Sequence, residues 1–221
     1  MDTPVLCLDT CVVLDILRDP ARADVRVHEH EASLALLSAA QSGSVLETLV
    51  AEQVSREYQD NVEQVQNDAR HSLKRRARDI GKLNTLVALY GTSRAIDLAH
   101  WDDHDKRVRQ AADLWFQAST TVRQSSSTVS NAFLRLNEAR SPARRGRQSM
   151  KDCVILETYL EHIRSLRDKG WTATAVFVSS NIRDYAADDK TTVRDDIKHE
   201  FQSLGLEYAP SMGAARGLLK L

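Results

Sequence analysis

An apolar run near the start of the sequence is interrupted by a carboxylate. Residues 5–15 read VLCLDTCVVLD, and Asp9 follows a stretch that has the length and composition of a buried strand. An ionised carboxylate that is buried without a partner costs several kcal/mol. Asp9 therefore needs a compensating group, and the candidates are a helix N-terminus, an Arg or Lys side chain, or a metal ion.

Further acidic and amide residues follow other predicted elements in the same way. Asp152 opens the predicted helix KDCVILETYL, and Glu57 lies in the first turns of the helix after LETLVAEQVS. Asn181 and Asp184 follow the apolar run AVFVSS. Taken singly, each has a structural explanation, as a helix cap, a residue on an exposed helix face or an ordinary loop residue.

Several carboxylates in one place would call for a cation. Two carboxylates about 4 Å apart repel by about 4 kcal/mol at an effective dielectric constant of about 20. Oxygen ligands without Cys or His suit a hard ion, Mg²⁺ or Mn²⁺, and such ions activate water for phosphodiester cleavage. If the acids converge, the sequence therefore indicates a metal-dependent phosphodiesterase.

The order of the predicted elements brings the acids together. Short apolar runs at 3–9, 44–50, 172–180 and 206–209 alternate with helical patterns, which predicts an α/β fold with a central parallel sheet. Ligands of such sheets bind beyond the carboxyl ends of the strands, where Asp9 and Asp184 are expected.

The predicted helices account for most of the remaining chain. A long helix begins at residue 51 with little to interrupt it before Gly91, and residues 92–138 are helical by composition. We predict a break between helices at 125–130, a loop at 141–149 and a polar loop around HEH at 28–30. Trp115 and Cys153 are expected to face the core.

Composition narrows the class of protein. The chain has 221 residues, of which 30 are Lys or Arg and 31 are Asp or Glu. Its three cysteines are too few for a disulfide framework, and no CxxC motif suggests zinc. We expect no signal peptide, no membrane span and a cytoplasmic location.

Four motifs, taken together, resemble the PIN-domain ribonucleases. They are VLCLDTCVVLDIL, TLVAEQVSREYQDN, SMKDCVILETYL and AVFVSSNIRDYA, and the resemblance covers residues 4–61 and 149–208. It implies a three-layer α/β/α fold in which residues 1–221 form one PIN-like domain. Residues 62–148 would then be a large helical insertion, as in the larger bacterial PIN-like proteins.

The resemblance also implies an acidic pocket that binds one or two Mg²⁺ or Mn²⁺ ions and cleaves RNA. Asp9, Asp152 and Asp184 would ligate a metal directly or through water. Glu57, which fits the family register better than Glu52, would ligate a second ion or orient water.

Three more residues would support this pocket. Thr10 and Asn181 would do so by hydrogen bonding, although many family members have Asp where this chain has Asn181. Glu157 is a secondary candidate, because it lies five residues after Asp152 and therefore about 140° further around the helix.

Basic residues are expected to hold the RNA. Arg144, Arg145, Arg147 and Lys151 lead into Asp152, and arginine forks suit phosphate without reading base sequence. Lys74, Arg75, Arg76 and Arg78 would extend that track or simply face solvent. A regulatory protein such as an antitoxin would fit the same rim, and a homodimer is common among similar proteins.

Other readings stay open at the level of the sequence. A catalytically weak PIN-like module that binds RNA or protein would retain the fold, and Asn181 favours it. A structure-specific DNA nuclease of related fold would share the acidic pocket. A helical scaffold whose acids are only caps would lack the sheet. Among PIN ribonucleases, toxin, defence and processing roles are not distinguished.

Overall fold

A five-stranded parallel sheet forms the centre of the molecule. The computed structural model describes residues 2–91, 94–143 and 149–221. The strands are ordered β3-β2-β1-β4-β5, and all neighbouring pairs are parallel. Their bounds are β1 Val5–Leu8, β2 Glu47–Ala51, β3 Ser119–Val122, β4 Ala175–Val178 and β5 Leu206–Ala209.

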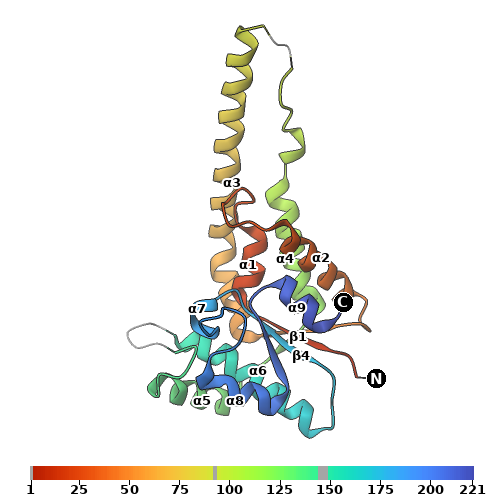
Figure 1. Cartoon of the computed structure of the whole chain (residues 1–221), viewed down its shortest axis with the longest axis vertical. Coiled ribbons are helices and arrows are strands. Elements are labelled where there is room, and N and C mark those ends of the chain that lie inside the picture. The colour runs from red at the N-terminus through yellow and green to blue at the C-terminus, as the bar shows by residue number, and fades with distance from the viewer. Residues whose placement is uncertain (1, 92–93, 144–148) are drawn as a thin grey trace.

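Helices cover both faces of this sheet (Figure 1). On one face α4 and α9 pack against the strands with α2 against them, and on the other α6 and α8 pack against the strands with α5 against α6. The helices are α1 Thr10–Leu17, α2 Val27–Gln41, α3 Glu52–Leu89, the 3₁₀ turn η1 Ala99–Trp101, α4 His104–Ala118, α5 Ser126–Asn137, α6 Met150–Asp168, α7 Ile182–Tyr185, α8 Asp195–Leu204 and α9 Met212–Leu219. This is the predicted three-layer α/β/α architecture.

The central strands are buried on both sides. Every residue of β1 and β4 is fully inaccessible to solvent, which explains why both read as continuous apolar runs. The Tyr159 hydroxyl of α6 donates to the Leu8 carbonyl at 2.5 Å and accepts from the Ala51 amide at 2.9 Å. This side chain therefore ties the carboxyl ends of β1 and β2 together.

Strand β3 was not predicted. Its sequence is STTV, and it forms the edge of the sheet beside β2, with two of its four residues exposed. A short polar edge strand lacks the apolar run by which buried strands are recognised, so the helical composition around it dominated the prediction. Residues 62–148 consequently contain a strand of the central sheet as well as helices.

Two local predictions were wrong. Residues 126–130 are not a break but the start of α5, where Ser125 and Thr128 form a capping box that satisfies the first backbone donors. The HEH residues 28–30 lie in the first turn of α2 rather than in a loop. The predictions that Trp115 and Cys153 are buried were correct.

The C-terminal half of α3 leaves the body of the molecule (Figure 1). The buried residues of α3 are Val54, Tyr58, Val62 and Ala69, all in its first half. Residues 74–91 and 94–103, which we call the arm, project away from the sheet as the outer part of α3 and the chain that returns beside it. Across the arm, the Asn84 amide group exchanges two hydrogen bonds of 3.0 Å with the backbone of Ile96.

Among the helices of the described residues, none is both long enough and apolar enough to cross a membrane.

Candidate active site

Asp9 lies between the end of β1 and the start of α1. It is 4% exposed and caps the helix, accepting a 2.7 Å hydrogen bond from the Thr10 amide. Its other oxygen accepts from the Ser179 hydroxyl at 2.5 Å and from the Cys11 thiol at 3.3 Å. Burial raises the pKa of Asp9, and these three hydrogen bonds oppose that rise.

Thr10 connects Asp9 to α3. The Thr10 hydroxyl donates to Glu57 Oε2 at 2.8 Å, while Gln53 donates to Oε1 of the same carboxylate at 3.2 Å. One oxygen of Glu57 is therefore oriented from α1 and the other from the preceding turn of α3 itself. Glu57 also contributes to raising the pKa of Asp9, so the two carboxylates interact electrostatically.

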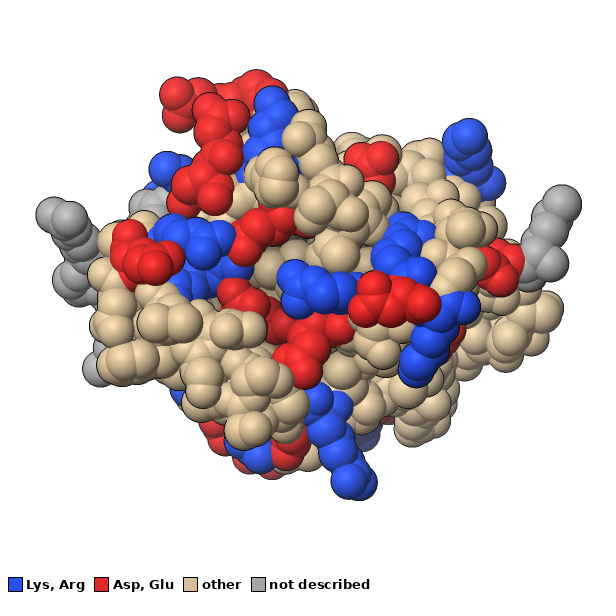
Figure 2. Space-filling model, turned by 90° about the horizontal axis from the view of Figure 1, so that it is seen from below, with Lys and Arg blue, Asp and Glu red and all other residues tan. Residues whose placement is uncertain are grey.

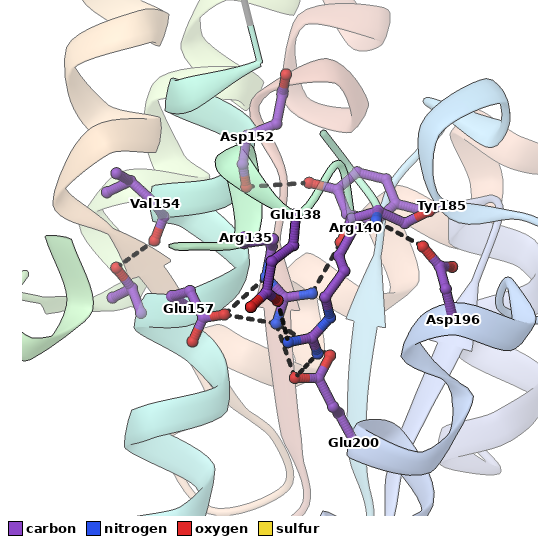
Figure 3. Close-up of polar contacts among 11 residues, drawn as sticks. Arg135, Glu138, Arg140, Asp152, Val154, Glu157, Tyr185, Asp196 and Glu200 are labelled. Atoms are coloured by element: carbon purple, nitrogen blue, oxygen red, sulfur yellow. Dashed lines mark hydrogen bonds and ion pairs between the residues drawn. The ribbon is translucent and has the colours of Figure 1, made fainter. Parts of the chain in front are cut away.

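Asp152 lies in the first turn of α6, which comes from the opposite face of the sheet. Burial raises its pKa to about 7, and the charges of Asp9, Glu57 and Asp184 raise it as well. Figure 3 shows its carboxyl group pointing away from the buried arginine below it, while the Tyr185 hydroxyl donates to its backbone carbonyl at 3.4 Å. Three distant segments thus bring negative charge to Asp152.

Asp184 and Asn181 belong to the short helix that follows β4. Asp184 is 9% exposed, and the Asn181 amide donates to its Oδ2 at 2.7 Å. An aspartate at position 181 could not donate this bond, so the asparagine orients Asp184 rather than adding another charge. Asn181 is thus hydrogen-bonded to Asp184, and its role in supporting a metal pocket stays a prediction.

The structure therefore brings Asp9, Glu57, Asp152 and Asp184 into one electrostatic cluster beyond the carboxyl ends of β1, β2 and β4. Across the described ranges, no three His, Cys, Asp or Glu side chains are grouped closely enough to hold a metal ion as they stand. The chemistry of the donors fits a hard divalent ion, because all are carboxylate oxygens and their mutual repulsion favours a cation. We take these four residues as the candidate active site.

Glu157 has a different environment. Its Oε1 accepts from Arg135 Nε at 2.7 Å, and Arg135, which is 1% exposed, also binds both oxygens of Glu200 at 2.9 Å (Figure 3). The side chain points away from Asp152, as the predicted rotation around the helix allows. Glu157 is thus part of a buried ion cluster and does not join the four acids.

The predicted RNA-binding residues are described only in part. Arg144, Arg145 and Arg147 lie outside the described residues. Lys151 is exposed in the first turn of α6, one residue before Asp152. The rim of the acidic cluster therefore has at least one exposed cation.

Ser179 and Cys11 are site residues that the sequence did not reveal. Ser179 is fully buried. Its hydroxyl binds Asp9 and also accepts a 3.2 Å hydrogen bond from the backbone N–H of Asn181, so Ser179 connects two segments of the site. Burial raises the pKa of Cys11, which keeps its thiol protonated and able to donate. Both follow a strand at the carboxyl edge of the sheet, which is the only signal that could have identified them.

A cavity of about 340 Å³ adjoins this network on the side of α1 and α2. Its wall includes Asp15 and Ser180, and the Ser180 hydroxyl donates to Asp15 at 2.7 Å. The Ser180 amide in turn donates to Cys11 at 3.2 Å. Hydrogen bonds through Ser180 and Cys11 therefore connect the wall of the cavity with Asp9.

Comparison with protein families gives one match. A family model described as PIN domain covers residues 6–185, which includes all four carboxylates and most of the chain. No curated protein and no solved structure gives a significant match.

Proposed function

The chain belongs to the PIN-domain family, and from this premise we propose that it is a Mg²⁺- or Mn²⁺-dependent endoribonuclease. Membership of the family indicates a nuclease-type function, and PIN domains typically use divalent metals. The convergence of four carboxylates from separate segments supports the proposal most directly: besides burial, the charges of Asp9, Glu57 and Asp184 raise the pKa of Asp152. Such crowding is favourable when a cation is bound among the acids.

On this proposal, each acid has a defined role. Asp9, Asp152 and Asp184 would hold the ion directly or through water, and Glu57 would hold a second ion or orient a water molecule. A bound ion would activate water and stabilise the negative charge that develops on the phosphate.

The neighbouring groups keep these acids in place. Thr10 fixes Glu57, Ser179 fixes Asp9, and Asn181 fixes Asp184. Each of these three residues supplies a hydrogen-bond donor to one of the carboxylates. The acids are thus presented to the ion with part of their orientation already set.

RNA would be held at the rim by Arg144, Arg145, Arg147 and Lys151. We also propose that a regulatory protein covers this rim and that the chain forms a homodimer. The biological setting, as a toxin, a defence nuclease or a processing enzyme, follows from the RNA that is cut.

A cleavage assay tests the function. Protein stripped with EDTA should not cut RNA, addition of Mn²⁺ or Mg²⁺ should restore cleavage, and Asp9→Asn or Asp152→Asn should abolish it. Asp195→Asn removes a 94% exposed carboxylate of α8 and serves as the matched control, with cleavage unchanged. Full cleavage by Asp9→Asn would refute the assignment.

The same assay separates the other readings. Preference for DNA of the same sequence would identify a DNA nuclease. Metal-independent binding of RNA without any cleavage would identify the catalytically weak module.

A further inference from the structure

The arm connects to the candidate active site through one continuous helix. α3 has 38 residues, begins with Glu52 beside β2 and carries Glu57 in its second turn. At 1.5 Å per residue, Arg75 lies about 27 Å from Glu57 along the axis and Lys82 about 38 Å. Figure 1 shows no other element of the body reaching as far as the outer part of this helix among the described residues.

Exposed cations gather on this part of α3. Lys74, Arg75, Arg78 and Lys82 are all exposed, and no ion pair within the described ranges involves them. Arg76 differs, because it donates to the Ala21 carbonyl at 2.8 Å and pairs with Asp19 at 3.6 Å. The four unpaired cations are therefore free to bind an external anion.

Their spacing makes them repel one another. Lys74, Arg78 and Lys82 follow each other at intervals of four residues, which places neighbouring like charges on the same side of the helix. Such rows destabilise an isolated helix, and this part of α3 has no buried residue to compensate. A bound polyanion would remove the repulsion.

The cations also align with the active site. Arg75 follows Glu57 by 18 residues, which is five turns of an α-helix, and Lys82 follows it by 25 residues, which is close to seven turns. Glu57, Arg75 and Lys82 therefore lie along one side of α3. Asp60 and Asp68 lie on the same side between Glu57 and Arg75. These acids interrupt any continuous row of cations along the first half of α3.

The opposite end of the molecule differs. Figure 2 views that end, and the Lys and Arg side chains visible there are interspersed with Asp and Glu side chains. A phosphate backbone would meet both signs of charge on that surface. The outer part of α3 is the more favourable anion-binding surface, with Asp79 as its one acid between residues 70 and 82.

We propose that Arg75, Arg78 and Lys82 form a second RNA-binding anchor, about 27–38 Å from the site of cleavage. The inference rests on the proposed function, which it deepens by naming the substrate class: RNA long enough to reach both the acidic cluster and the arm. Because Asp60 and Asp68 lie between the acidic cluster and the arm cations, the RNA contacts the protein at these two sites and not along the whole of α3. Short RNA would occupy the acidic cluster alone.

Binding in EDTA tests the anchor without requiring cleavage. The variant Arg75→Gln/Arg78→Gln/Lys82→Gln keeps good helix formers while removing three charges, and Lys169→Gln/Lys198→Gln/Lys220→Gln removes three exposed charges elsewhere. For a long single-stranded RNA, the slope of log Kd against log salt concentration should fall by about 2 in the arm variant, since each phosphate contact contributes about 0.7. The control should keep the wild-type slope. Equal slopes in all three proteins would overturn the anchor.

Cleavage of short and long RNA separates this inference from the proposed function. Wild type should cleave the long RNA with a higher kcat/KM than the short one, and the arm variant should lose that preference while cleaving the short RNA normally. If wild type cuts RNA without any dependence on length, the anchor is refuted and the function stands. If wild type cuts no RNA, the function fails. If the arm variant alters self-association and leaves RNA binding unchanged, the surface is a protein contact and the anchor is overturned.

Discussion

The four acids of the candidate site are held in different ways. Asp9 accepts hydrogen bonds from an amide, a hydroxyl and a thiol, which offset part of the cost of its burial. Asp152 has less such support, and both its burial and its acidic neighbours raise its pKa, to about 7. In the metal-free protein, Asp152 therefore takes up a proton close to neutral pH.

Asp152→Asn should change how stability depends on pH. The pKa of Asp152 is raised from 3.8 to about 7 in the folded state. The contribution of Asp152 to the free energy of unfolding is therefore fully present below about pH 4 and is lost as the pH rises through 7. Asparagine resembles the protonated form, so in EDTA the variant should be more stable than wild type at alkaline pH. The gap should widen by about 1–3 kcal/mol between about pH 5 and pH 8.5.

Urea unfolding at the two pH values measures this difference. Asp195→Asn, an exposed acid of α8, supplies the control and should follow wild type. A constant gap between Asp152→Asn and wild type would show that Asp152 does not titrate in this range.

Ser179→Ala should weaken the site without unfolding it. The variant loses the 2.5 Å hydrogen bond to Asp9 and the hydroxyl oxygen that accepts from the backbone N–H of Asn181. One such bond to a charged group is worth about 1.5–3 kcal/mol, so we expect at least a tenfold loss in metal-dependent cleavage. Ser180→Ala, whose hydroxyl binds Asp15 instead, is the neighbouring control. Cleavage at the wild-type rate and at the same Mn²⁺ midpoint would remove Ser179 from the site.

Some site residues could be predicted from the sequence and others could not. Asp9 and Asp184 follow apolar strands, so the rule for parallel sheets predicts their position. Ser179 has the same position, but a serine after a strand is too common to be singled out without its contact to Asp9. The Thr10–Glu57 bond joins residues 47 positions apart and arises only when α1 packs against α3.

At the scale of elements, α6 is positioned by the helices beneath it. Arg135 of α5 binds Glu157 of α6, Glu200 of α8 and the Ser141 carbonyl, so one buried guanidinium connects three segments (Figure 3). A smaller apolar cluster of Ala132, Ala143, Cys153 and Val154 packs beside the start of α6. These contacts hold the first turn of α6, and with it Asp152.

Arg135→Met should be strongly destabilising. It leaves two carboxylates without their buried partner, which typically costs about 3–5 kcal/mol. Replacing Glu157 and Glu200 by Gln in the same chain should recover a large part of that loss, because the unpaired charges are then absent. Denaturant unfolding of the single and triple variants gives both values. Arg140→Met, which removes a more exposed partner of Glu200, should cost less. A triple variant no more stable than Arg135→Met would contradict the explanation.

The elements themselves were predictable to different degrees. β1 and β4 are buried on both faces, so their apolar runs are unambiguous, and the long α3 has no breaker before Gly91. β3 presents polar side chains at the sheet edge and resembles its helical surroundings. The Arg135 cluster joins three helices through tertiary packing, which helix periodicity does not encode.

At the scale of the whole molecule, the body and the arm differ in what stabilises them. The main apolar core includes residues from all five strands, although β3 contributes only Val122. None of its residues belongs to the arm. Leu86, Leu89 and Tyr90 near the end of α3 are exposed, Tyr90 by 91%. The arm therefore adds exposed surface to the molecule and no residue to its apolar core.

Removal of the arm should leave the body folded. Replacing residues 74–103 by a short turn joins α3 to α4 as an antiparallel helix pair, a common connection. We expect the midpoint of thermal unfolding to change by only a few degrees, because no core residue is lost. Calorimetry and far-ultraviolet circular dichroism measure this. Loss of cooperative unfolding would show that the arm is needed for the fold.

The arm is fixed to the body at its inner end and projects freely at its outer end. The clamped end of α3 runs from Val54 to Ala69 and includes Glu57. Just beyond it, Arg70 binds Asp105, Ser72 binds Asp19 and Arg76 binds the Ala21 carbonyl, and further out Asn84 pairs with Ile96 within the arm. Long helices bend gently, and a bend beyond the clamp displaces the tip while leaving the clamped residues where they are. The outer end of α3 can thus bend to fit ligands of different curvature without moving the Glu57 carboxylate.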